Sequence, residues 1–567
     1  MTDPCNIAAA LPKLAAERPD QIAMRCPSGS GRYDVTLTYA QLDARSDAIA
    51  AGLARHGIRR GVRTVVMVRP TPEFFLLMFA LFKAGAVPVL VDPGIDKRAL
   101  KQCLREAQPQ AFIGIPLAHL ARVLLGWARS ARIRITTGAF ALLADTTLAR
   151  VERDGAVIHA NTVGASQLAD TEPDEVAAIV FTSGSTGIPK GVVYRHRHFV
   201  AQIEMMRAAF DMQPGGVDLP TFPPFALFDP ALGLTSIIPD MDPTRPASAD
   251  PRKLLAAIER FGVTQLFGSP ALMRVLADHG APLKGVTRIT SAGAPVPADV
   301  VAKIRTLMPE HGQFWTPYGA TECLPVATIE GRELVGLRER TEAGAGTCVG
   351  RPVPPNEVRL IRVTDDAIER WSDDLIVQGG LVGEITVAGP TATDTYFSRD
   401  AQTRLAKIRE TLPDGSERVV HRMGDLGYFD RDGRLWFCGR KTQRVVTAAT
   451  TLCTEQIEPV FNTHPDVRRT ALVGIGAFGT QQAALCVELR AGVDAKEWPR
   501  IEEELRHLGE GHVHTAKVER FLHYPKSFPV DIRHNAKIGR EKLALWAAKQ
   551  KPPRRDDTQE DGWGRGR

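Results

Sequence analysis

Apolar runs that alternate between helical and strand spacing most constrain the fold of this chain. The predicted helices cover 39–56, 72–84, 252–261, 271–279 and 298–307, and the predicted strands cover 64–68, 87–91, 177–181, 265–268 and 288–291. Turn residues separate these elements. Strands that alternate with helices are typical of layered α/β structures. The sequence therefore predicts a large, multi-layered α/β core.

The pattern changes after about residue 379, where strand pairs with acidic turns replace the alternation. A strand is predicted over 383–388, and a hairpin over 427–438 with an Asp432-Gly433 turn. A smaller α+β unit follows, with helices predicted over 454–462, 497–507 and 540–549 and strands over 470–474 and 483–489. We place the domains at 1–439 and 440–549. Residues 550–567 have too little apolar content to order themselves and are predicted to form a disordered tail.

Composition excludes several classes of protein. With 44% hydrophobic and 24% charged residues among 567, the chain is a folded globular protein rather than a fibrous or disordered one. The net charge of +6 is small for this length and gives no support to nucleic-acid binding. Eight scattered cysteines without a C-x-x-C pattern and an N-terminus without an apolar run favour a reducing cytoplasm.

The most apolar stretch, residues 74–91, is predicted to be buried in the protein rather than in a membrane. Lys83, Gly85 and Pro88 interrupt it within the length that a bilayer helix needs. We therefore expect a buried helix that runs into a buried strand, and no transmembrane segment.

A loop rich in hydroxyl groups and glycine directly follows the strand predicted at 177–181. It reads Thr182-Ser183-Gly184-Ser185-Thr186-Gly187-Ile188-Pro189-Lys190-Gly191. Backbone N–H groups of such a loop can turn toward phosphate oxygens, and Lys190 adds a positive charge. It is not a Walker A loop, because the lysine follows Pro189 and precedes Gly191. The sequence predicts a phosphate-binding loop.

This decapeptide is similar to the signature loop of the adenylate-forming superfamily, which includes acyl-CoA synthetases, luciferases and the adenylation domains of peptide synthetases. Further motifs resembling that superfamily follow in order. They are an adenine-side loop (Ser291-Ala292-Gly293-Ala294-Pro295), a segment that stacks adenine and gives a carboxylate to Mg²⁺ (Tyr318-Gly319-Ala320-Thr321-Glu322), a ribose-binding aspartate (Gly424-Asp425-Leu426), a hinge (Gly439-Arg440) and a catalytic-lysine segment (Ala536-Lys537-Ile538-Gly539-Arg540). Ala536 stands where the family usually has Gly. The resemblance covers nearly the whole chain apart from the tail.

The resemblance implies the adenylate-forming enzyme fold, in which a large N-terminal α/β domain carries a small mobile α+β domain, with ATP and Mg²⁺ as cofactors. It implies nucleotide binding by Thr182, Ser183, Gly184, Ser185, Thr186, Gly187, Lys190, Ala292, Gly293, Ala294, Pro295, Tyr318, Gly319, Ala320, Thr321, Asp425 and Arg440. The implied catalytic residues are Thr186, Lys190, Glu322 and Lys537, with Glu322 as the Mg²⁺ ligand. The residue types suit this role, because charge that develops on phosphates in transit requires cations and fixed donors.

Three longer segments resemble one branch of the superfamily, the β-lactone synthetases of bacterial long-chain olefin biosynthesis. They span 181–196, 315–326 and 528–538. By that resemblance the substrate is a 2-alkyl-3-hydroxyalkanoic acid, and the products are a β-lactone, AMP and pyrophosphate. After adenylation the substrate's own 3-hydroxyl would attack the acyl carbon, which gives the group a high effective concentration. His196, His534 or a phosphate oxygen could accept the hydroxyl proton.

The resemblance leaves rival functions to be weighed. Relatives that transfer the acyl group to a thiol usually have Asp or Lys at the hinge, where this chain has Thr442, and 450–458 lacks the Gly and Pro typical of that region. These departures do not favour thioester formation, but a fatty-acyl-CoA or fatty-acyl-AMP ligase remains the alternative. A non-catalytic interaction subunit would need decayed motifs, and the motifs are intact. The pathway resemblance also implies a complex with a hydrolase-fold decarboxylase and a ketone reductase.

Three weaker patterns are interpreted as follows. Gly474 to Gly479 match G-x-G-x-x-G, but a strand is predicted after them instead of the helix that a dinucleotide site requires. His196 and His198 could lie on one strand face, but a third metal ligand is not evident. Residues 222–229 hold three aromatic side chains, which by the resemblance would form a wall of the acyl pocket and otherwise would pack in the core.

Overall fold

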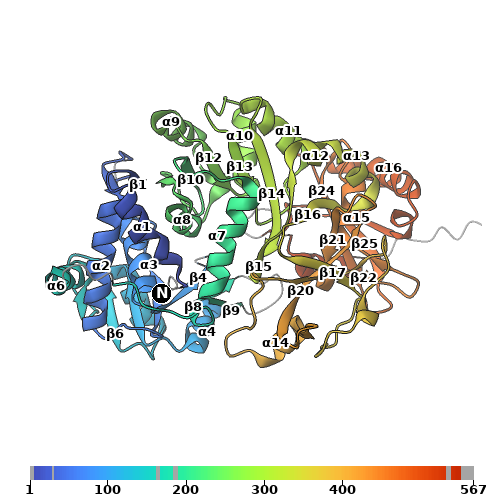
Figure 1. Ribbon diagram of the computed structural model, residues 1–567. Helices are drawn as coiled ribbons and strands as arrows, with labels where there is room; N and C mark the ends of the chain where they lie inside the picture. The colour runs from blue at the N-terminus through green and yellow to red at the C-terminus, as the bar shows by residue number, and fades with distance from the viewer. Residues whose placement is uncertain are drawn as a thin grey trace, which may run out of the picture. The chain divides into compact units, whose positions relative to one another are not determined.

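The computed structural model describes residues 5–28, 31–92, 94–160, 167–182, 189–530 and 538–550 (Figure 1). This part of the chain divides into two compact units. The larger unit runs to residue 442 without 342–344, and the smaller unit contains 342–344, 443–530 and 538–550. The division directly follows Thr442, and the boundary predicted from the sequence lies three residues earlier, after residue 439.

Two mixed β-sheets form the framework of the larger unit. The first has the strand order β7 (Thr146–Thr147), β6 (Ile133–Thr136), β5 (Ala111–Gly114), β3 (Arg63–Met67), β4 (Val87–Val91), β8 (Val176–Thr182) and β9 (Lys190–Arg195). The second has the order β17 (Glu357–Ile361), β18 (Gly383–Ala388), β20 (Glu417–Phe429), β21 (Leu435–Arg440), β16 (Thr347–Pro352), β15 (Cys323–Glu330), β14 (Gln313–Ala320), β13 (Arg288–Ser291), β12 (Gln265–Gly268), β10 (Val217–Pro220), β11 (Thr235–Ile237), β1 (Ile22–Cys26) and β2 (Val35–Thr38), with β19 (Lys407–Thr411) paired to β20.

Helices pack against these sheets. They are α1 (Ala10–Glu17), α2 (Tyr39–Arg55), α3 (Pro72–Lys83), α4 (Lys97–Ala107), α5 (Pro116–Leu125), α6 (Leu148–Ala160), α7 (His196–Phe210), α8 (Asp229–Leu232), α9 (Pro251–Phe261), α10 (Pro270–His279), α11 (Ala298–Leu307), α12 (Gly331–Gly336), α13 (Arg338–Arg340) and α14 (Asp400–Ala406). Figure 1 shows α9, α10 and α11 beside strands β12 to β14, and apolar side chains from all of these elements share one core cluster.

The predicted α/β alternation is confirmed, and the helix boundaries follow local sequence signals. Helix α2 begins after Thr38, whose hydroxyl accepts from the backbone N–H of Gln41 in a reciprocal capping box. Helix α9 begins with Pro251 after the Asp250 cap and ends at Gly262, which has a φ of +62°. These signals place the helix ends within one or two residues of their predicted positions.

The apolar stretch 74–91 forms a buried helix and a buried strand, as predicted. Every residue of α3 from Phe74 to Lys83 is buried. The Lys83 ammonium has no exposed surface and lies 2.6 Å from a carboxylate oxygen of Asp43 and 2.7 Å from one of Asp47, which supply the opposite charge that a buried cation requires. Among the described residues, no helix is both long enough and apolar enough to cross a membrane.

The second sheet gathers loops at one of its edges. Strands β10, β12, β13 and β14 run parallel, so their carboxyl ends point the same way. Strand β14 then turns back as the antiparallel hairpin with β15. In α/β sheets ligands bind at the carboxyl ends of parallel strands. This edge therefore brings together the segments 221–228, 291–295 and 316–322.

The predicted hairpin near residue 430 exists, but its first strand is longer than predicted. Residues 427–429 end the thirteen-residue strand β20. The connecting loop covers 430–434 and is organised by Asp430, whose Oδ1 accepts from the backbone N–H groups of Asp432 and Arg434 at 3.0 Å each. An acidic turn residue with local hydrogen bonds is the physical basis of the turn signal.

The smaller unit contains two short sheets and three α-helices. They are β22 (Val445–Val446) with β23 (Thr451–Leu452), β24 (Val467–Ile475) with β25 (Gln482–Leu489) and β26 (Arg520–His523), and α15 (Thr454–Phe461), α16 (Trp498–Glu510) and α17 (Arg540–Ala547). The glycine pattern 474–479 lies in the β24–β25 hairpin, where Ile475 pairs with Gln482. A strand follows it, as predicted, which removes the basis for a dinucleotide site.

Two buried carboxyl groups face each other between β10, β11 and α8. Asp218 and Asp229 are 8% and 3% exposed, and the hydroxyl of Ser236 donates to Asp229. Burial raises the pKa of Asp229 to about 7, and burial beside Asp229 raises the pKa of Asp218 well above its usual range. At least one of the two carboxyls is therefore protonated in the folded protein at mildly acidic pH.

This pair predicts that stability falls as the pH rises. A folded-state pKa above the unfolded value stabilises the fold at low pH, and that contribution is lost as the pH rises from about 4 through about 7. We expect the melting temperature of the wild type to fall more steeply between pH 5 and 8 than that of Asp229→Asn, measured by calorimetry. The exposed substitution Asp432→Asn is the control. Equal pH dependence in all three proteins would contradict the assignment.

Candidate active site

The predicted phosphate loop connects the antiparallel strands β8 and β9. Thr182 lies opposite Lys190 in the strand register. The side chain of Thr182 is outside the described part of the structure, as are the predicted loop residues Ser183, Gly184, Ser185, Thr186 and Gly187. Lys190 begins β9, and its Nζ lies 4.8 Å from the ring centroid of Tyr396, within cation–π range.

Glu322 lies in the turn that joins β14 to β15, and neighbouring segments hold this turn in place. The hydroxyl of Tyr194 donates to the carbonyl oxygen of Thr321. The carbonyl oxygen of Glu322 accepts from the backbone N–H of Thr393 at 2.8 Å and from its hydroxyl at 3.0 Å. Strand β9 and the segment around Thr393 thus fix the backbone of both turn residues.

The Glu322 carboxylate is oriented by a buried tyrosine. The hydroxyl of Tyr396 donates to Oε1 of Glu322 at 2.7 Å, and no described residue donates to Oε2. Burial and the adjacent carboxylate raise the pKa of Tyr396, so its hydroxyl stays protonated and remains a donor. Mg²⁺ takes one or two protein carboxylates and completes its coordination with water and phosphate oxygens. A carboxylate with one oxygen hydrogen-bonded to Tyr396 and the other oxygen without a described donor therefore fits the predicted Mg²⁺ ligand.

Tyr396 and Lys407 belong to this cluster and were missed by the sequence analysis. Lys407 is 7% exposed, and its Nζ donates to the carbonyl oxygen of Thr393 and lies 5.7 Å from the Tyr396 ring centroid. Burial lowers the pKa of Lys407 to about 8. Tyr396 is 74 residues from Glu322 in the sequence and lies in none of the segments that resemble a motif. Only the folded arrangement identifies these two side chains.

Asp425 is buried beside Tyr318 and Arg440. The β20–β21 register pairs Asp425 with Arg440, and its Oδ2 accepts from the hydroxyl of Tyr318 at 2.6 Å. Its Oδ1 lies 3.1 Å from Arg440 Nε, yet no described donor forms a well-aligned hydrogen bond with it. Burial raises the pKa of this carboxyl, and Arg440 opposes that shift. An incompletely bonded buried oxygen fits an acceptor for the hydroxyl groups of a ribose.

The predicted adenine-side loop leaves the carboxyl end of β13. Thr290 of β13 pairs with Trp315 of β14, so Ala292, Gly293, Ala294 and Pro295 leave the sheet next to the strand segment that contains Tyr318, Gly319 and Ala320. Gly293 has a φ of +99°, a backbone conformation that favours glycine. A side chain on Gly319 would come within 2.8 Å of the Cys323 carbonyl oxygen. Glycine is thus required where the hairpin closes.

The residues around Glu322 and those around Asp425 interact electrostatically through Arg440 and therefore belong to one site of the larger unit. Asp425 raises the pKa of Arg440 most strongly, and Tyr318, Glu322 and Tyr396 contribute in the same direction. The site therefore combines residues of β9, the β14–β15 turn, β20 and β21. Lys537 lies outside the described residues, so its predicted catalytic role stays a prediction.

A buried ion-pair network lies at the end of the larger unit next to Thr442. Arg422 donates to Glu384 at 2.6 Å, and both side chains are 1% exposed. Lys441 Nζ lies 3.0 Å from the other oxygen of Glu384 and donates to the carbonyl oxygen of Thr364 at 2.8 Å. These contacts fix the residue that directly precedes the predicted hinge position.

The structure corrects the proposed placement of His196 and His198 on a strand face. Strand β9 ends at Arg195, and both histidines lie in the first turn of α7. His198 Nδ1 accepts from the backbone N–H of Arg195 at 2.9 Å, so this histidine caps the helix. His196 has no exposed surface, and burial lowers its pKa to about 4. The two imidazoles have separate structural environments and do not form a metal site.

Aromatic side chains gather at the same sheet edge as the adenine-side loop. The Phe225 and Phe267 ring centroids are 4.2 Å apart, and Phe222 and Phe228 lie 5.5 Å and 6.2 Å from Phe225. Phe222, Phe225 and Phe228 are each only partly buried. They therefore present apolar surface beside the site and can contact an acyl chain.

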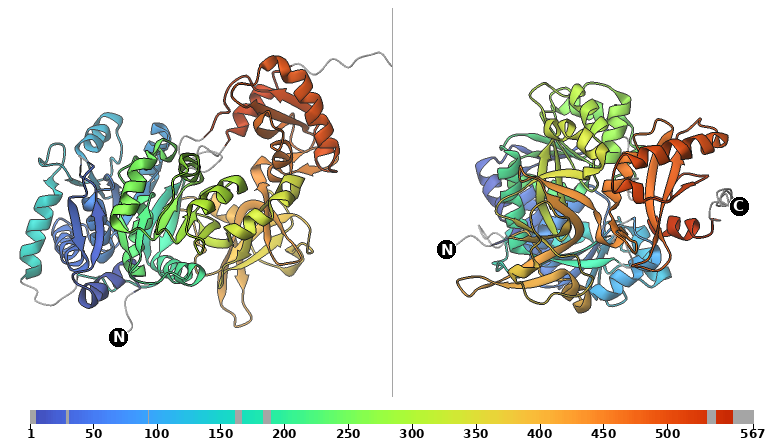
Figure 2. Two further views of the ribbon diagram at one scale, coloured as in Figure 1. Left: turned by 90° about the horizontal axis from the view of Figure 1, so that it is seen from above. Right: turned by 90° about the vertical axis from the view of Figure 1, so that its right-hand side faces the viewer.

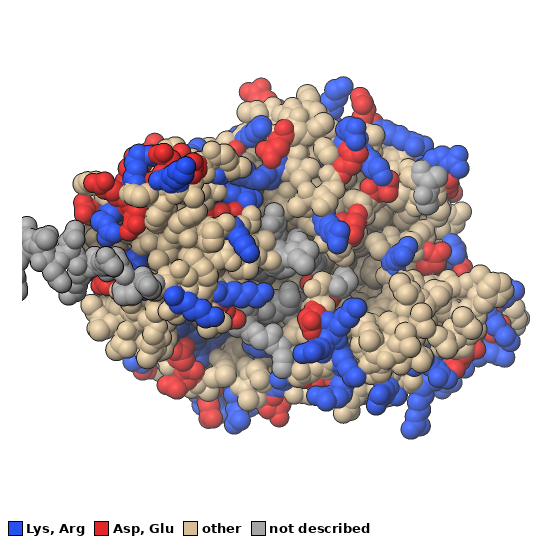
Figure 3. Space-filling view, turned by 180° about the vertical axis from the view of Figure 1, so that it is seen from behind, with Lys and Arg blue, Asp and Glu red and all other residues tan. Residues whose placement is uncertain are grey.

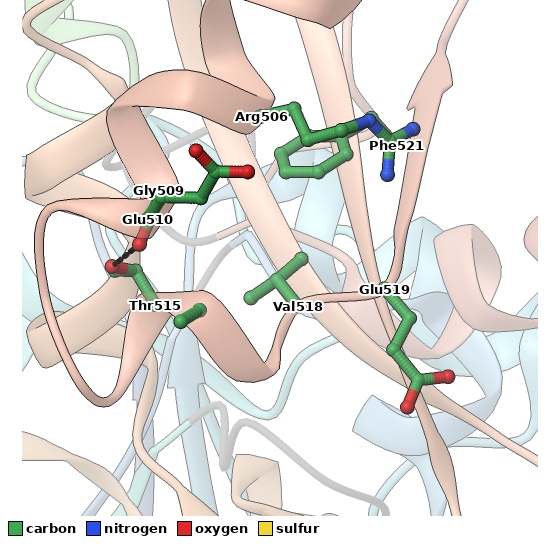
Figure 4. A pocket seen from close by; sticks show the side chains of 8 residues that line it. Arg506, Gly509, Glu510, Thr515, Val518, Glu519 and Phe521 are labelled. Carbon is green, nitrogen blue, oxygen red and sulfur yellow. Dashed lines mark hydrogen bonds between the residues drawn. The ribbon is translucent and has the colours of Figure 1, made fainter.

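Two other features of the described residues do not join this site. His464, Asp466 and Glu504 lie close enough together to hold a metal ion, but Arg500 pairs with both carboxylates at 2.7 Å and already supplies the opposite charge. A cavity of about 300 Å³ lies between α16 and β26 (Figure 4). Its polar Thr515 hydroxyl is bonded to the Gly509 carbonyl oxygen at 2.6 Å, and none of the predicted site residues line it.

Charges of both signs are interspersed on the face of the molecule shown in Figure 3. Lys and Arg side chains alternate with Asp and Glu across the described surface of that face.

Comparisons with known proteins give the family and the relatives. The family model described as AMP-binding enzyme matches residues 11–397. An olefin beta-lactone synthetase of Xanthomonas campestris pv. campestris is 73% identical over 557 residues, which cover 97% of this chain and 99% of the relative. An olefin beta-lactone synthetase of Stenotrophomonas maltophilia is 68% identical, with 97% and 99% covered. The solved structure of O-succinylbenzoate Coenzyme A synthetase from Bacillus subtilis with ATP and magnesium ion has a TM-score of 0.70 at 19% identity, covering 94% of this chain and 98% of that one.

The tyrosine that orients Glu322 predicts a specific defect. Tyr396→Phe removes one hydrogen bond to Glu322 and leaves the carboxylate in place, so we expect the affinity for Mg²⁺ to fall by about 10- to 100-fold, as for other residues that orient metal ligands. This affinity is measured by calorimetric titration of Mg²⁺ into the protein in the presence of a non-hydrolysable ATP analogue. Tyr428→Phe is the matched control, because the Tyr428 hydroxyl has no hydrogen bond to a described residue. Unchanged affinity in Tyr396→Phe would show that Tyr396 does not orient the ligand.

Proposed function

This chain belongs to the AMP-binding enzyme family, and we propose that it is an ATP-dependent β-lactone synthetase. It activates a 2-alkyl-3-hydroxyalkanoic acid as an acyl-adenylate and closes it to a β-lactone, releasing AMP and pyrophosphate. The observation that carries this proposal is the identity of 73% to an olefin beta-lactone synthetase over 97% of the chain. The α/β fold predicted from the resemblance to adenylate-forming enzymes is confirmed.

The first step joins the substrate carboxylate to AMP. A carboxylate oxygen attacks the α-phosphorus of ATP, and the bond from that phosphorus to pyrophosphate breaks. Asp425 accepts hydrogen bonds from the ribose hydroxyls through the oxygen that has no well-aligned donor in the protein. Lys190 and Lys537 neutralise charge that develops on the phosphates, and the loop 182–187 donates backbone hydrogen bonds to them. Thr186 contributes a hydroxyl to this loop.

Glu322 would hold Mg²⁺ through its open oxygen, while Tyr396 fixes the other oxygen. The ion would supply positive charge to the phosphates. The protein's own contribution is the rigid turn, because Thr393 and Tyr194 prevent Glu322 from moving away as charge shifts during the reaction. Ala292 to Pro295 and Tyr318 to Thr321 border the adenine at the same edge of the sheet.

The second step is intramolecular. The 3-hydroxyl oxygen attacks the acyl carbon, its proton leaves to a base, and the bond from that carbon to the AMP oxygen breaks. His196 is not placed to be the base, since its imidazole has no exposed surface and its pKa is lowered to about 4. A phosphate oxygen of the adenylate, or His534, remains as the acceptor. Holding the hydroxyl near the acyl carbon supplies much of the rate acceleration.

The phenylalanines at the sheet edge form one wall of the acyl pocket. Phe222, Phe225 and Phe228 lie at the carboxyl end of β10, beside the loop that borders the adenine. An acyl chain that extends from the α-phosphate toward β10 buries apolar surface against these rings. The scattered cysteines favour action in the cytoplasm, and the resemblance to the olefin branch implies a complex with a hydrolase-fold decarboxylase and a ketone reductase.

The product distinguishes this function from that of a coenzyme A ligase. Purified protein receives ATP, Mg²⁺ and a synthetic 2-alkyl-3-hydroxy acid, with and without coenzyme A, and proton NMR at low temperature identifies the organic product. We expect β-lactone in equal amounts in both samples, because the substrate carries its own nucleophile. A thioester formed only with coenzyme A would refute the synthetase function and support a fatty-acyl-CoA ligase.

A variant serves as the control for this experiment. Lys537→Ala is expected to abolish pyrophosphate release, with an unchanged melting temperature that shows an intact fold. Pyrophosphate release at the wild-type rate would remove Lys537 from the proposed mechanism, while lactone formation by the wild type would still stand.

A further inference from the structure

Exposed apolar side chains are concentrated in one short part of the chain. Seventeen large hydrophobic residues are exposed in the described structure, and eight of them lie between Leu117 and Leu143. The most exposed of these are Phe140 at 84%, and Leu124 and Leu142 at 73% each. Monomeric soluble proteins rarely expose contiguous apolar surface on this scale without an interaction that uses it.

Helix α5 carries five of these eight residues. Leu117, Leu120 and Leu124 recur at helical spacing and are all exposed. The inner face is anchored by His119, which has no exposed surface and whose Nε2 is 3.0 Å from the carbonyl oxygen of Ile135. A surface helix normally turns polar residues outward. Helix α5 instead presents leucines to its surroundings.

The loop after β6 adds to the same surface. The Arg122 guanidinium of α5 donates to the carbonyl oxygen of Leu143 at 3.2 Å. The backbone of Gly138 packs so tightly on Pro116, the first residue of α5, that a Cβ there would come within 2.5 Å of the proline ring. We call the exposed residues Leu117, Leu120, Leu124, Phe140 and Leu142 the α5 surface. In both views of Figure 2 the light-blue part of the chain that contains α5 lies at the edge of its unit.

Positive charge accompanies this surface, and negative charge is missing from the segment that forms it. The sequence from Ala107 to Ala144 contains four arginines and no aspartate or glutamate. Arg134 pairs with Asp145 at 2.6 Å. Arg129 and Arg132 are exposed, and neither forms an ion pair with a described residue. The α5 surface is therefore apolar with unneutralised cations beside it.

We propose that the α5 surface docks on an anionic lipid surface. Leucine and phenylalanine side chains that protrude from a helix and an adjacent loop, with arginines at their border, match the pattern of interfacial segments that insert into the headgroup region. Arg129 and Arg132 add attraction to anionic headgroups. The lack of acidic residues over the whole segment favours this occupant over a protein partner, whose interface rim is ordinarily of mixed charge. The inference goes beyond the proposed function and does not depend on it.

The test is sedimentation of the full-length protein with phosphatidylglycerol vesicles and with phosphatidylcholine vesicles. We expect the wild type to bind the anionic vesicles. Leu120→Glu/Leu124→Glu is expected to bind them at least about tenfold more weakly, because the variant removes two leucines that the lipid would cover. The Arg129→Ala/Arg132→Ala variant is expected to bind more weakly and with less dependence on salt. Both leucines are exposed in the free protein, so the melting temperature is expected to stay unchanged.

A matched control uses exposed apolar residues of the smaller unit. Val513 and Leu545 are 86% and 68% exposed, and Val513→Glu/Leu545→Glu is expected to bind vesicles like the wild type. The proposal would be overturned if this control lost as much vesicle binding as Leu120→Glu/Leu124→Glu, or if the wild type did not bind anionic vesicles. Self-association in sedimentation velocity that Leu120→Glu/Leu124→Glu abolishes, without lipid binding, would assign the surface to a second copy instead.

The outcome for the α5 surface is separable from the outcome for the enzyme function. Turnover of a short-chain, water-soluble 3-hydroxy acid without vesicles is expected to be equal in Leu120→Glu/Leu124→Glu and the wild type, because the α5 surface contains none of the site residues. Loss of lipid binding with unchanged turnover is the expected pattern. Lost turnover in the variant at an unchanged melting temperature would show that α5 serves the active site and would overturn its assignment to lipid docking.

Discussion

The hydrogen bonds that fix the Thr321–Glu322 turn are the constraint on which the rest of the site depends. Tyr194 and Thr393 fix the backbone of the turn, and Tyr396 fixes one oxygen of the Glu322 carboxylate. Because these donors come from β9 and from the segment before α14, the turn joins both sheets of the larger unit. A preorganised carboxylate does not need to reorient as phosphate charge develops, which is the main physical requirement of this chemistry.

The same arrangement connects the nucleotide site to the end of the larger unit. Asp425 pairs with Arg440, and the next residue, Lys441, is held by buried Glu384. Glu384 in turn pairs with Arg422 in the strand that carries Asp425. The ion pair of Asp425, the predicted ribose-binding residue, and the ion pairs that precede Thr442 are therefore separate, but strand β20 and the adjacent residues Arg440 and Lys441 connect them.

The sequence predicted the layered α/β fold well, because the ends of helices and the turns between strands leave local signals. Helix α9 has its Asp250 cap and Gly262 stop, and the turn residues of the Glu322 hairpin lie in one short motif. Tyr396 could not be predicted, since its contact with Glu322 spans 74 residues and depends on the pairing of distant segments. His196 was misplaced for a related reason: a strand ends at Arg195, and only the fold shows where the following helix begins.

In this mechanism ATP activates the carboxylate and not the 3-hydroxyl. A substrate with ¹⁸O in both carboxylate oxygens tests it by mass spectrometry of AMP and of the organic product. We expect one label in AMP and one in the lactone carbonyl, with an unlabelled ring oxygen from the 3-hydroxyl. Both labels in the lactone and none in AMP would contradict it, because the hydroxyl would then have been the leaving group.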